Sequence, residues 1–174
     1  MMKTLINLYK DHVTEWKNCT RCELSQQRER IVLAKGDIPC DVLFLGEAPG
    51  ESEDVVGLPF VGPAGRLLEA LISRAVRNSA VREMKFAFTN LVACFPKEMK
   101  DIGVNEPPDY TIKECMPRVS EFIALADPSR IVCVGKLASK WIERIMSHSD
   151  ILRIHIPHPA AILRANIANQ GLLS

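Results

Sequence analysis

Residues 42–50 read VLFLGEAPG, and they indicate the kind of fold that this chain adopts. The first five of these residues are apolar or glycine without interruption, as expected of a strand that is covered on both faces of its sheet. A turn containing Pro and Gly follows at once. Similar β-rich runs occur further along the chain at 86–91 (FAFTNL), 130–135 (RIVCVG) and 151–156 (ILRIHI). The sequence therefore predicts four strands.

Helical patterns lie between these runs. Residues 64–78 place apolar side chains on one stripe at helical spacing. Residues 110–126 begin after two prolines and end before another, and residues 136–147 form a third, shorter candidate. Alternating strands and helices predict an α/β fold with a mainly parallel sheet. Because no repeat or linker interrupts the chain, we expect one domain over residues 1–174.

The composition excludes several classes of protein. With 174 residues, 47% hydrophobic and 25% charged, the chain is neither disordered, nor collagen-like, nor a coiled coil. No uncharged apolar run is long enough to span a bilayer, and no secretory signal is recognisable, so we expect a cytoplasmic protein without membrane contact. The net charge of +1 means that any nucleic-acid contact must come from charge concentrated on one face.

Polar residues and turn formers follow all four predicted strands. They are found at 47–50 (EAPG), at Asn90, at 135–136 (GK) and at 157–159 (PHP). In a parallel sheet the ligand crevice lies beyond the carboxyl ends of the strands. The sequence therefore predicts a functional site where these four segments meet.

Four of the six cysteines form a candidate metal site. A C-x2-C pair points two thiolates at one metal, and two further cysteines from distant segments can complete a four-sulfur site for Zn²⁺ or an iron–sulfur cluster. The wide separation of the second pair favours [4Fe–4S], and buried thiols without metal remain the alternative. These residues are Cys19, Cys22, Cys94 and Cys115.

The other two thiols have a different context. Cys40 precedes an apolar strand and Cys133 lies within one. Packing in the core is the expected role of both.

Five segments together resemble the family 4 uracil-DNA glycosylases, which are the iron–sulfur members of the uracil-DNA glycosylase superfamily. The resemblance runs from about residue 15 to residue 164 and implies a three-layer α/β/α sandwich on a central four-stranded parallel sheet. It also implies one structural [4Fe–4S] cluster on the four cysteines named above. The segments are CTRCELSQQR (19–28), GEAPGESED (46–54), GLPFVGPAG (57–65), TNLVAC (89–94) and HPAAILR (158–164).

The resemblance implies a monofunctional hydrolase that flips uracil out of DNA and cleaves its N-glycosidic bond. His158 is similar to the family's histidine that donates to uracil O2, and Phe60 to the ring on which uracil stacks. Asn90 resembles the residue whose amide reads uracil N3–H and O4. Gly50 stands where better-known relatives carry a tyrosine, and Glu53 matches the carboxylate that excludes the thymine methyl.

Other site residues follow from the same resemblance. Glu47 is the candidate for orienting the attacking water, because Ala48, beside the base, stands where the most active relatives have an aspartate. We expect its partners to be single- or double-stranded DNA that contains uracil and the enzymes that process abasic sites. We also expect the chain to be a monomer. The expected DNA contacts are Gly62, Gly65, Gly135, Lys136, Leu163 (or Ile162) and Arg164.

Three other interpretations stay open. The chain could be a DNA-binding accessory protein that has kept the glycosylase shape without its activity. It could act on another base or on RNA, because Pro157 and Ala160 depart from the commoner family residues. It could also be an interaction domain structured by zinc, which a colourless protein containing zinc but no iron would support.

Overall fold

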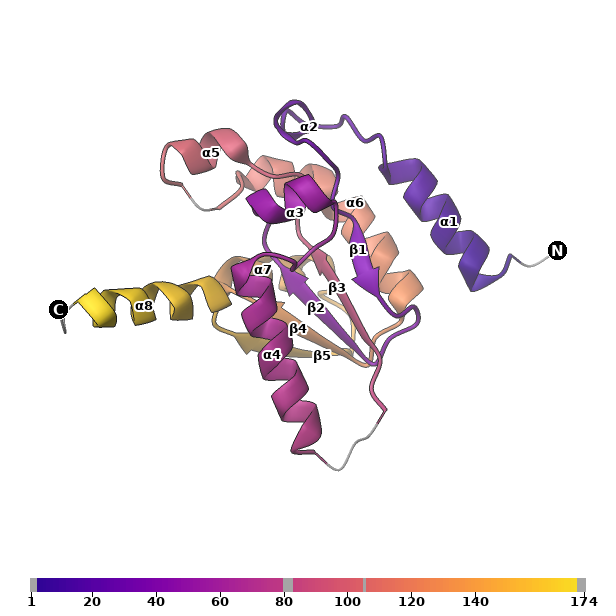
Figure 1. Cartoon of the computed structure of the whole chain (residues 1–174). Coiled ribbons are helices and arrows are strands. Elements are labelled where there is room, and N and C mark those ends of the chain that lie inside the picture. Colours follow the sequence, from indigo (N-terminus) through magenta and orange to yellow (C-terminus); the bar gives the residue numbers. More distant parts are fainter. Residues whose placement is uncertain (1–2, 80–82, 105, 172–174) are drawn as a thin grey trace.

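The computed structural model describes residues 3–79, 83–104 and 106–171, and a five-stranded sheet lies at its centre (Figure 1). The strand order is β1-β3-β2-β4-β5. The last four strands along the chain are parallel to one another, and β1 pairs with β3 in the antiparallel sense. The strands are β1 (Ala34–Gly36), β2 (Val42–Gly46), β3 (Phe86–Asn90), β4 (Arg130–Val134) and β5 (Leu152–Ile156).

The sequence pattern predicts four strands, whereas the sheet has a fifth, β1, which the pattern does not indicate. This strand has only three residues, Ala-Lys-Gly, which is too short to show any periodicity. Its partner β3 determines its conformation through the pairing of Ala34 with Thr89 and of Gly36 with Ala87. The edge of β3 is thereby covered, which removes a row of unpaired backbone groups.

Both faces of the sheet are buried at β2, which explains the uninterrupted apolar character of this strand. Leu43 and Leu45 belong to one core cluster, which includes residues of the helices α6 and α7. Val42 and Phe44 belong to a second cluster on the opposite face, together with Leu68 of α4. Alternate side chains of one strand point to opposite faces, so the four side chains from Val42 to Leu45 are divided between the two cores.

Eight helices are assigned within the described residues. The expected helices at 64–78, 110–126 and 136–147 correspond to α4, α6 and α7, with ends that differ by one or two residues. Figure 1 shows α8 projecting from the body of the molecule beside α4. The helices are α1 (Leu5–Trp16), α2 (Leu24–Gln27), α3 (Glu51–Val56), α4 (Pro63–Arg77), α5 (Lys97–Asp101), α6 (Asp109–Ala126), α7 (Lys136–Ile145) and α8 (Pro159–Gly171).

The parallel strands bring their carboxyl ends to one edge of the sheet. The amide of Leu91, just after β3, donates to the carbonyl of Gly46 at the end of β2 (3.0 Å), and Gly135 donates to Ile156 at the end of β5 (3.0 Å). These bonds hold the strand exits side by side. None of the described helices is both long and apolar enough to cross a membrane.

Candidate functional site

A cavity of about 940 Å³ opens at this edge of the sheet. It is lined by the segments after all four parallel strands and by the first turns of α3, α4 and α8. Every residue expected to bind uracil, take part in catalysis or contact DNA lines this cavity, with Leu163 and not Ile162 as the apolar candidate. These residues are Glu47, Ala48, Glu53, Phe60, Gly62, Gly65, Asn90, Gly135, Lys136, His158, Leu163 and Arg164.

Asn90 and Phe60 both lie beside Gly46 and line the cavity. A Cβ at Gly46 would collide with Asn90 Oδ1 and would lie 2.7 Å from Phe60 Cζ, so only glycine leaves room for both side chains. Asn90 is 3% exposed, and its side-chain amide has no hydrogen-bond partner within the described residues. The ring of Phe60 packs at a tilt on Phe88, with 5.7 Å between centroids.

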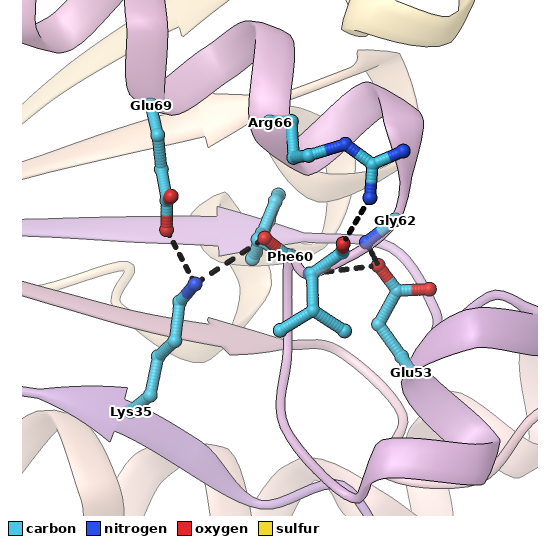
Figure 2. Close-up of polar contacts among 7 residues, drawn as sticks. Lys35, Glu53, Phe60, Gly62, Arg66 and Glu69 are labelled. Carbon is cyan, nitrogen blue, oxygen red and sulfur yellow. Dashed lines mark hydrogen bonds and ion pairs between the residues drawn. The ribbon is translucent and has the colours of Figure 1, made fainter.

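The segment that carries Phe60 is held by charged side chains, as Figure 2 shows. Phe60 has a φ of 56°, in the left-handed region that a bulky residue rarely adopts. Lys35 of β1 donates to its carbonyl at 3.2 Å and pairs with Glu69 of α4. Arg66 donates to the next carbonyl, that of Val61, at 2.9 Å. These contacts stabilise a backbone conformation that would otherwise be strained.

Glu53 completes this arrangement from the other side. Its Oε1 accepts from the amides of Val61 (3.0 Å) and Gly62 (2.8 Å), and its Oε2 accepts from Gly50 (3.0 Å). The carboxylate thus connects the start of α3 to the Phe60 segment, a role that the sequence did not indicate. The space around it is tight, because a Cβ at Gly50 would lie 2.8 Å from Oε2.

His158 lies after β5 with its ring oriented by the backbone. The amide of Ala160 donates to Nδ1 at 3.2 Å. An amide can only donate, so in the neutral ring the proton is on Nε2. Burial lowers the pKa of His158, the nearby cations Arg164 and Lys100 lower it further, and Glu53 opposes them. The ring is therefore a neutral donor at physiological pH.

The side chains of Glu47 and His158 both lie beside Gly135. Gly135 has a φ of 101°, and a Cβ there would collide with Glu47 Oε1 and lie 3.5 Å from His158 Cδ2. The amide of Leu137 donates to Glu47 Oε1 at 3.3 Å. Burial raises the pKa of Glu47, the Leu137 amide opposes this, and the charge of Glu106 adds to it.

The expected DNA contacts surround the mouth of the cavity. Lys136 and Arg164 are exposed there, and Leu163 is half-buried. The amide of Gly62 is already bound by Glu53, so a phosphate at the start of α4 would depend on the amides of Ala64 and Gly65.

Several lining residues escaped the sequence analysis. Lys100 and Glu106 reach the cavity from the segment around α5, and Phe95 lines it after β3. Lys35, which holds Phe60, lies on the strand that was also missed. No motif marks these residues, because their roles depend on contacts between distant parts of the chain.

The four predicted metal-ligand cysteines line a second, smaller hollow. Burial raises the pKa of Cys94 to about 11, Arg28 opposes this rise, and the thiols of Cys115 and Cys22 add to it, so these sulfurs are near neighbours. Arg28 donates to Cys94 Sγ at 3.0 Å. Among the described residues, however, no three His, Cys, Asp or Glu side chains form a group that would hold a single metal ion.

Cys40 and Cys133 lie apart from this hollow. They are 6% and 1% exposed, and both belong to the core cluster that contains Leu43. Their placement agrees with the packing role expected from the sequence.

Comparisons with known proteins identify relatives of this chain. Residues 33–171 match the family model described as the uracil DNA glycosylase superfamily. The type-4 uracil-DNA glycosylase of Pyrobaculum aerophilum is 35% identical over 75% of this chain and 62% of its own length. Those of Saccharolobus solfataricus and Thermotoga maritima are 35% and 34% identical, over 76% and 70% of this chain and 58% and 59% of their own. The chain thus spans about three-fifths of these curated relatives.

Proposed function

Because the chain belongs to the uracil-DNA glycosylase superfamily, we propose that it removes uracil from DNA. The reaction breaks the bond between uracil N1 and deoxyribose C1′, with the electron pair leaving on uracil. One water is consumed, whose hydroxyl ends on C1′ and whose proton ends on uracil. The products are free uracil and an abasic site. The observation that carries this proposal is the open amide of Asn90 in one cavity with Phe60 and His158.

Asn90 supplies the recognition of the base. Its amide oxygen accepts from uracil N3–H and its amide nitrogen donates to O4, while Phe60 provides the surface on which the flipped ring stacks. Cytosine presents the opposite pattern of donor and acceptor, so it would leave buried polar groups unpaired. Glu53 excludes the thymine methyl by fixing the positions of the two loops that its carboxylate joins.

His158 stabilises the leaving group. Negative charge develops on uracil O2 as the glycosidic bond breaks, and a donor already aimed at that oxygen lowers the barrier. The neutral ring has one N–H available for this, at Nε2, because Nδ1 accepts from Ala160. The lowered pKa keeps this arrangement intact through the physiological range.

Glu47 orients the attacking water. Burial and the nearby Glu106 raise the pKa of its carboxyl, and a carboxylate with a raised pKa accepts a proton more readily. Ala48, next along the chain, offers no second carboxylate. Water positioning therefore depends on Glu47 and on backbone groups.

DNA binds across the mouth of the cavity. Lys136 and Arg164 contact phosphates, and Leu163 fills the space that the flipped base leaves in the stack. Phosphate contacts of this kind position the duplex without reading its sequence. One copy of the chain carries every residue of the site, which supports a monomer as the active form.

The cysteine hollow holds a [4Fe–4S] cluster. The residues fit such a group, because four thiols and the guanidinium of Arg28 line one hollow, and a cation that donates to Cys94 Sγ suits a site with thiolate ligands. When bound, the cluster joins the chain around α1 and α2 to the end of β3 and to α6. We also propose that the chain has the three-layer α/β/α arrangement of the family.

The direct test is a glycosylase assay on oligonucleotides, single- and double-stranded, that carry one uracil, thymine or cytosine at a fixed position. We expect alkaline strand cleavage at uracil only. Intact strands would overturn the proposal, and tight binding to uracil-containing DNA without cleavage would favour the accessory protein. Loss of cleavage in Asn90→Ala and His158→Gln, with unchanged unfolding temperatures, would support the assigned roles.

A further inference from the structure

Arg118 of α6 is a buried cation that lines the cysteine hollow and also contacts Asn90. It is 1% exposed, and within the described residues no carboxylate forms an ion pair with it. Its Nη1 donates to Thr89 Oγ1 at 3.1 Å, and its Nη2 donates to the carbonyls of Asn90 (2.5 Å) and Leu91 (3.2 Å). Its Nε has no hydrogen-bond partner in the part of the chain that the structure describes.

A guanidinium buried in this way needs negative charge close by, because removing a charge from water is costly unless another group compensates it. Two carbonyls and a hydroxyl supply only partial charges. Arg118 also lines the hollow that contains Cys94 and Cys115. Thiolates that hold a cluster in that hollow would supply the missing negative charge.

We propose that Arg118 is a positioning residue that couples the cysteine site to the recognition of the base. The charge of the thiolate-ligated group holds the guanidinium in the interior. The same guanidinium fixes the backbone carbonyls of Asn90 and Leu91, and through them the amide that reads the base. This inference rests on the proposed function, because it assigns Asn90 to uracil and the cysteines to a cluster.

Arg28 provides a matched control for this role. It lines the same hollow and donates to Cys94 Sγ (3.0 Å) and to the carbonyl of Cys19 (2.8 Å). It makes no hydrogen bond to β3 or to Asn90 among the described residues. Removing either arginine takes one positive charge from the cysteine hollow, but only the removal of Arg118 frees the end of β3.

The experiment compares Arg118→Met, Arg118→Lys and Arg28→Met with the wild type, all purified with their iron. The measurements are iron per chain, the reduction potential of the cluster, hydrogen exchange of the peptide covering 86–95, and single-turnover release of uracil. Arg118→Lys keeps the charge but loses the forked contact with two carbonyls, so it separates the two parts of the role. If Arg118→Met does not fold, Arg118→Lys still tests the proposal.

We expect both Met variants to shift the reduction potential to a more negative value, because each removes a positive charge beside the cluster. Both Arg118 variants should exchange faster over 86–95 and release uracil at least about tenfold more slowly, because a buried charged hydrogen bond is lost. Arg28→Met should match the wild type in exchange. Arg118→Lys should keep the wild-type potential.

The coupling is overturned if Arg118→Lys exchanges and reacts like the wild type, or if Arg118→Met leaves the potential unchanged. A wild-type protein that contains no iron would also overturn the coupling. In that case the release of uracil would still test the proposed function. If the wild type binds iron but releases no uracil, the proposed function fails. The potential and the exchange of 86–95 then still decide whether Arg118 links the two sites.

Discussion

At Asn90, a side chain with 3% of its surface exposed lines the cavity, and its amide has no hydrogen bond to the other described residues. Such a group is costly in a folded protein unless a ligand satisfies it. The strand itself determines where it points, since Asn90 is the last residue of β3 and pairs in register with Gly46. In the proposed function, base selection would therefore depend on one amide whose position the sheet fixes.

Replacement of Asn90 by Ala should slow single-turnover release of uracil by about 100-fold, because the base loses both specific hydrogen bonds. Asn78→Ala, at the exposed end of α4, is the control and should behave like the wild type. Equal rates in the two variants would mean that Asn90 does not read the base.

The pH dependence of His158 is a second prediction at the residue scale. Its folded pKa lies below the ordinary 6.5, chiefly through burial, with Arg164 adding to the effect. The midpoint of its protonation therefore lies below pH 6.5, and the ring is mostly neutral at physiological pH. Protonation at Nδ1 breaks the bond from Ala160, so activity should fall through the lowered pKa.

Arg164→Gln removes a positive charge near the ring and should raise the pKa of His158 toward 6.5. The acidic limb of the pH–rate profile should then move to higher pH. NMR titration of the histidine ring protons, with His158→Gln to assign the signal, measures the same shift directly. A limb that stays in place would show that titration of His158 does not control the rate.

At the scale of elements, the Phe60 segment depends on β1 and α4 (Figure 2). Lys35→Met removes the donor to the Phe60 carbonyl and the partner of Glu69. Uracil release should slow about tenfold, because a charged hydrogen bond no longer stabilises the left-handed backbone. Lys35→Arg should recover most of the rate.

Lys85→Met is the control for that change, because Lys85 is an exposed lysine that lies outside the lining of the cavity. Single-turnover release of uracil should be slower in Lys35→Met and unchanged in Lys85→Met. If Lys35→Met released uracil at the wild-type rate, the left-handed conformation of Phe60 would not need this contact.

The turn between β4 and α7 gives a further prediction. Gly135 and Gly103 both have positive φ, of 101° and 79°, but a Cβ at Gly103 meets nothing within 4 Å. Alanine at either position should lower the free energy of unfolding by about 1–3 kcal/mol through backbone strain. Only Gly135→Ala should also abolish uracil release, because its Cβ displaces Glu47. Denaturant unfolding and single-turnover kinetics distinguish the two effects, and activity in Gly135→Ala would contradict this.

At the scale of the whole molecule, the cysteine hollow connects segments that are far apart in the sequence. Its lining comes from the chain between α1 and β1, from the exit of β3 and from α6. Cys22→Ala should lower the iron content and the unfolding temperature together, because bound metal stabilises only the folded chain. Cys40→Ala, in the core, should keep its iron. Iron retained in Cys22→Ala would place the cluster elsewhere.

Much of the architecture was predictable from local pattern. The strands β2 and β4 are almost continuously apolar because both faces of the sheet are covered, and the apolar stripe of α4 packs on one of those faces. The three residues of β1 and the six of α3 were missed, because neither carries a periodic signal. Pairing with β3 and the contacts of Glu53 determine their conformations.

Some residues of the site were likewise indicated by local pattern, and others were not. The placement of Asn90 and His158 at the cavity was predictable, because Asn90 ends β3, His158 comes two residues after β5, and each lies in a recognisable motif. Their roles stay predictions. Lys35 and Arg118 were not predictable, since each acts on backbone carbonyls far away in the sequence. A pattern records side-chain types along the chain, whereas these two roles arise only when the folded backbone brings a carbonyl to a cation.

A crystal structure with an oligonucleotide that carries a non-hydrolysable deoxyuridine analogue would test the proposed recognition most directly. We expect the base to be everted, with N3–H and O4 on the amide of Asn90, O2 toward Nε2 of His158 and the ring against Phe60. A base that remains stacked in the duplex, or that binds away from these three side chains, would contradict the proposed function.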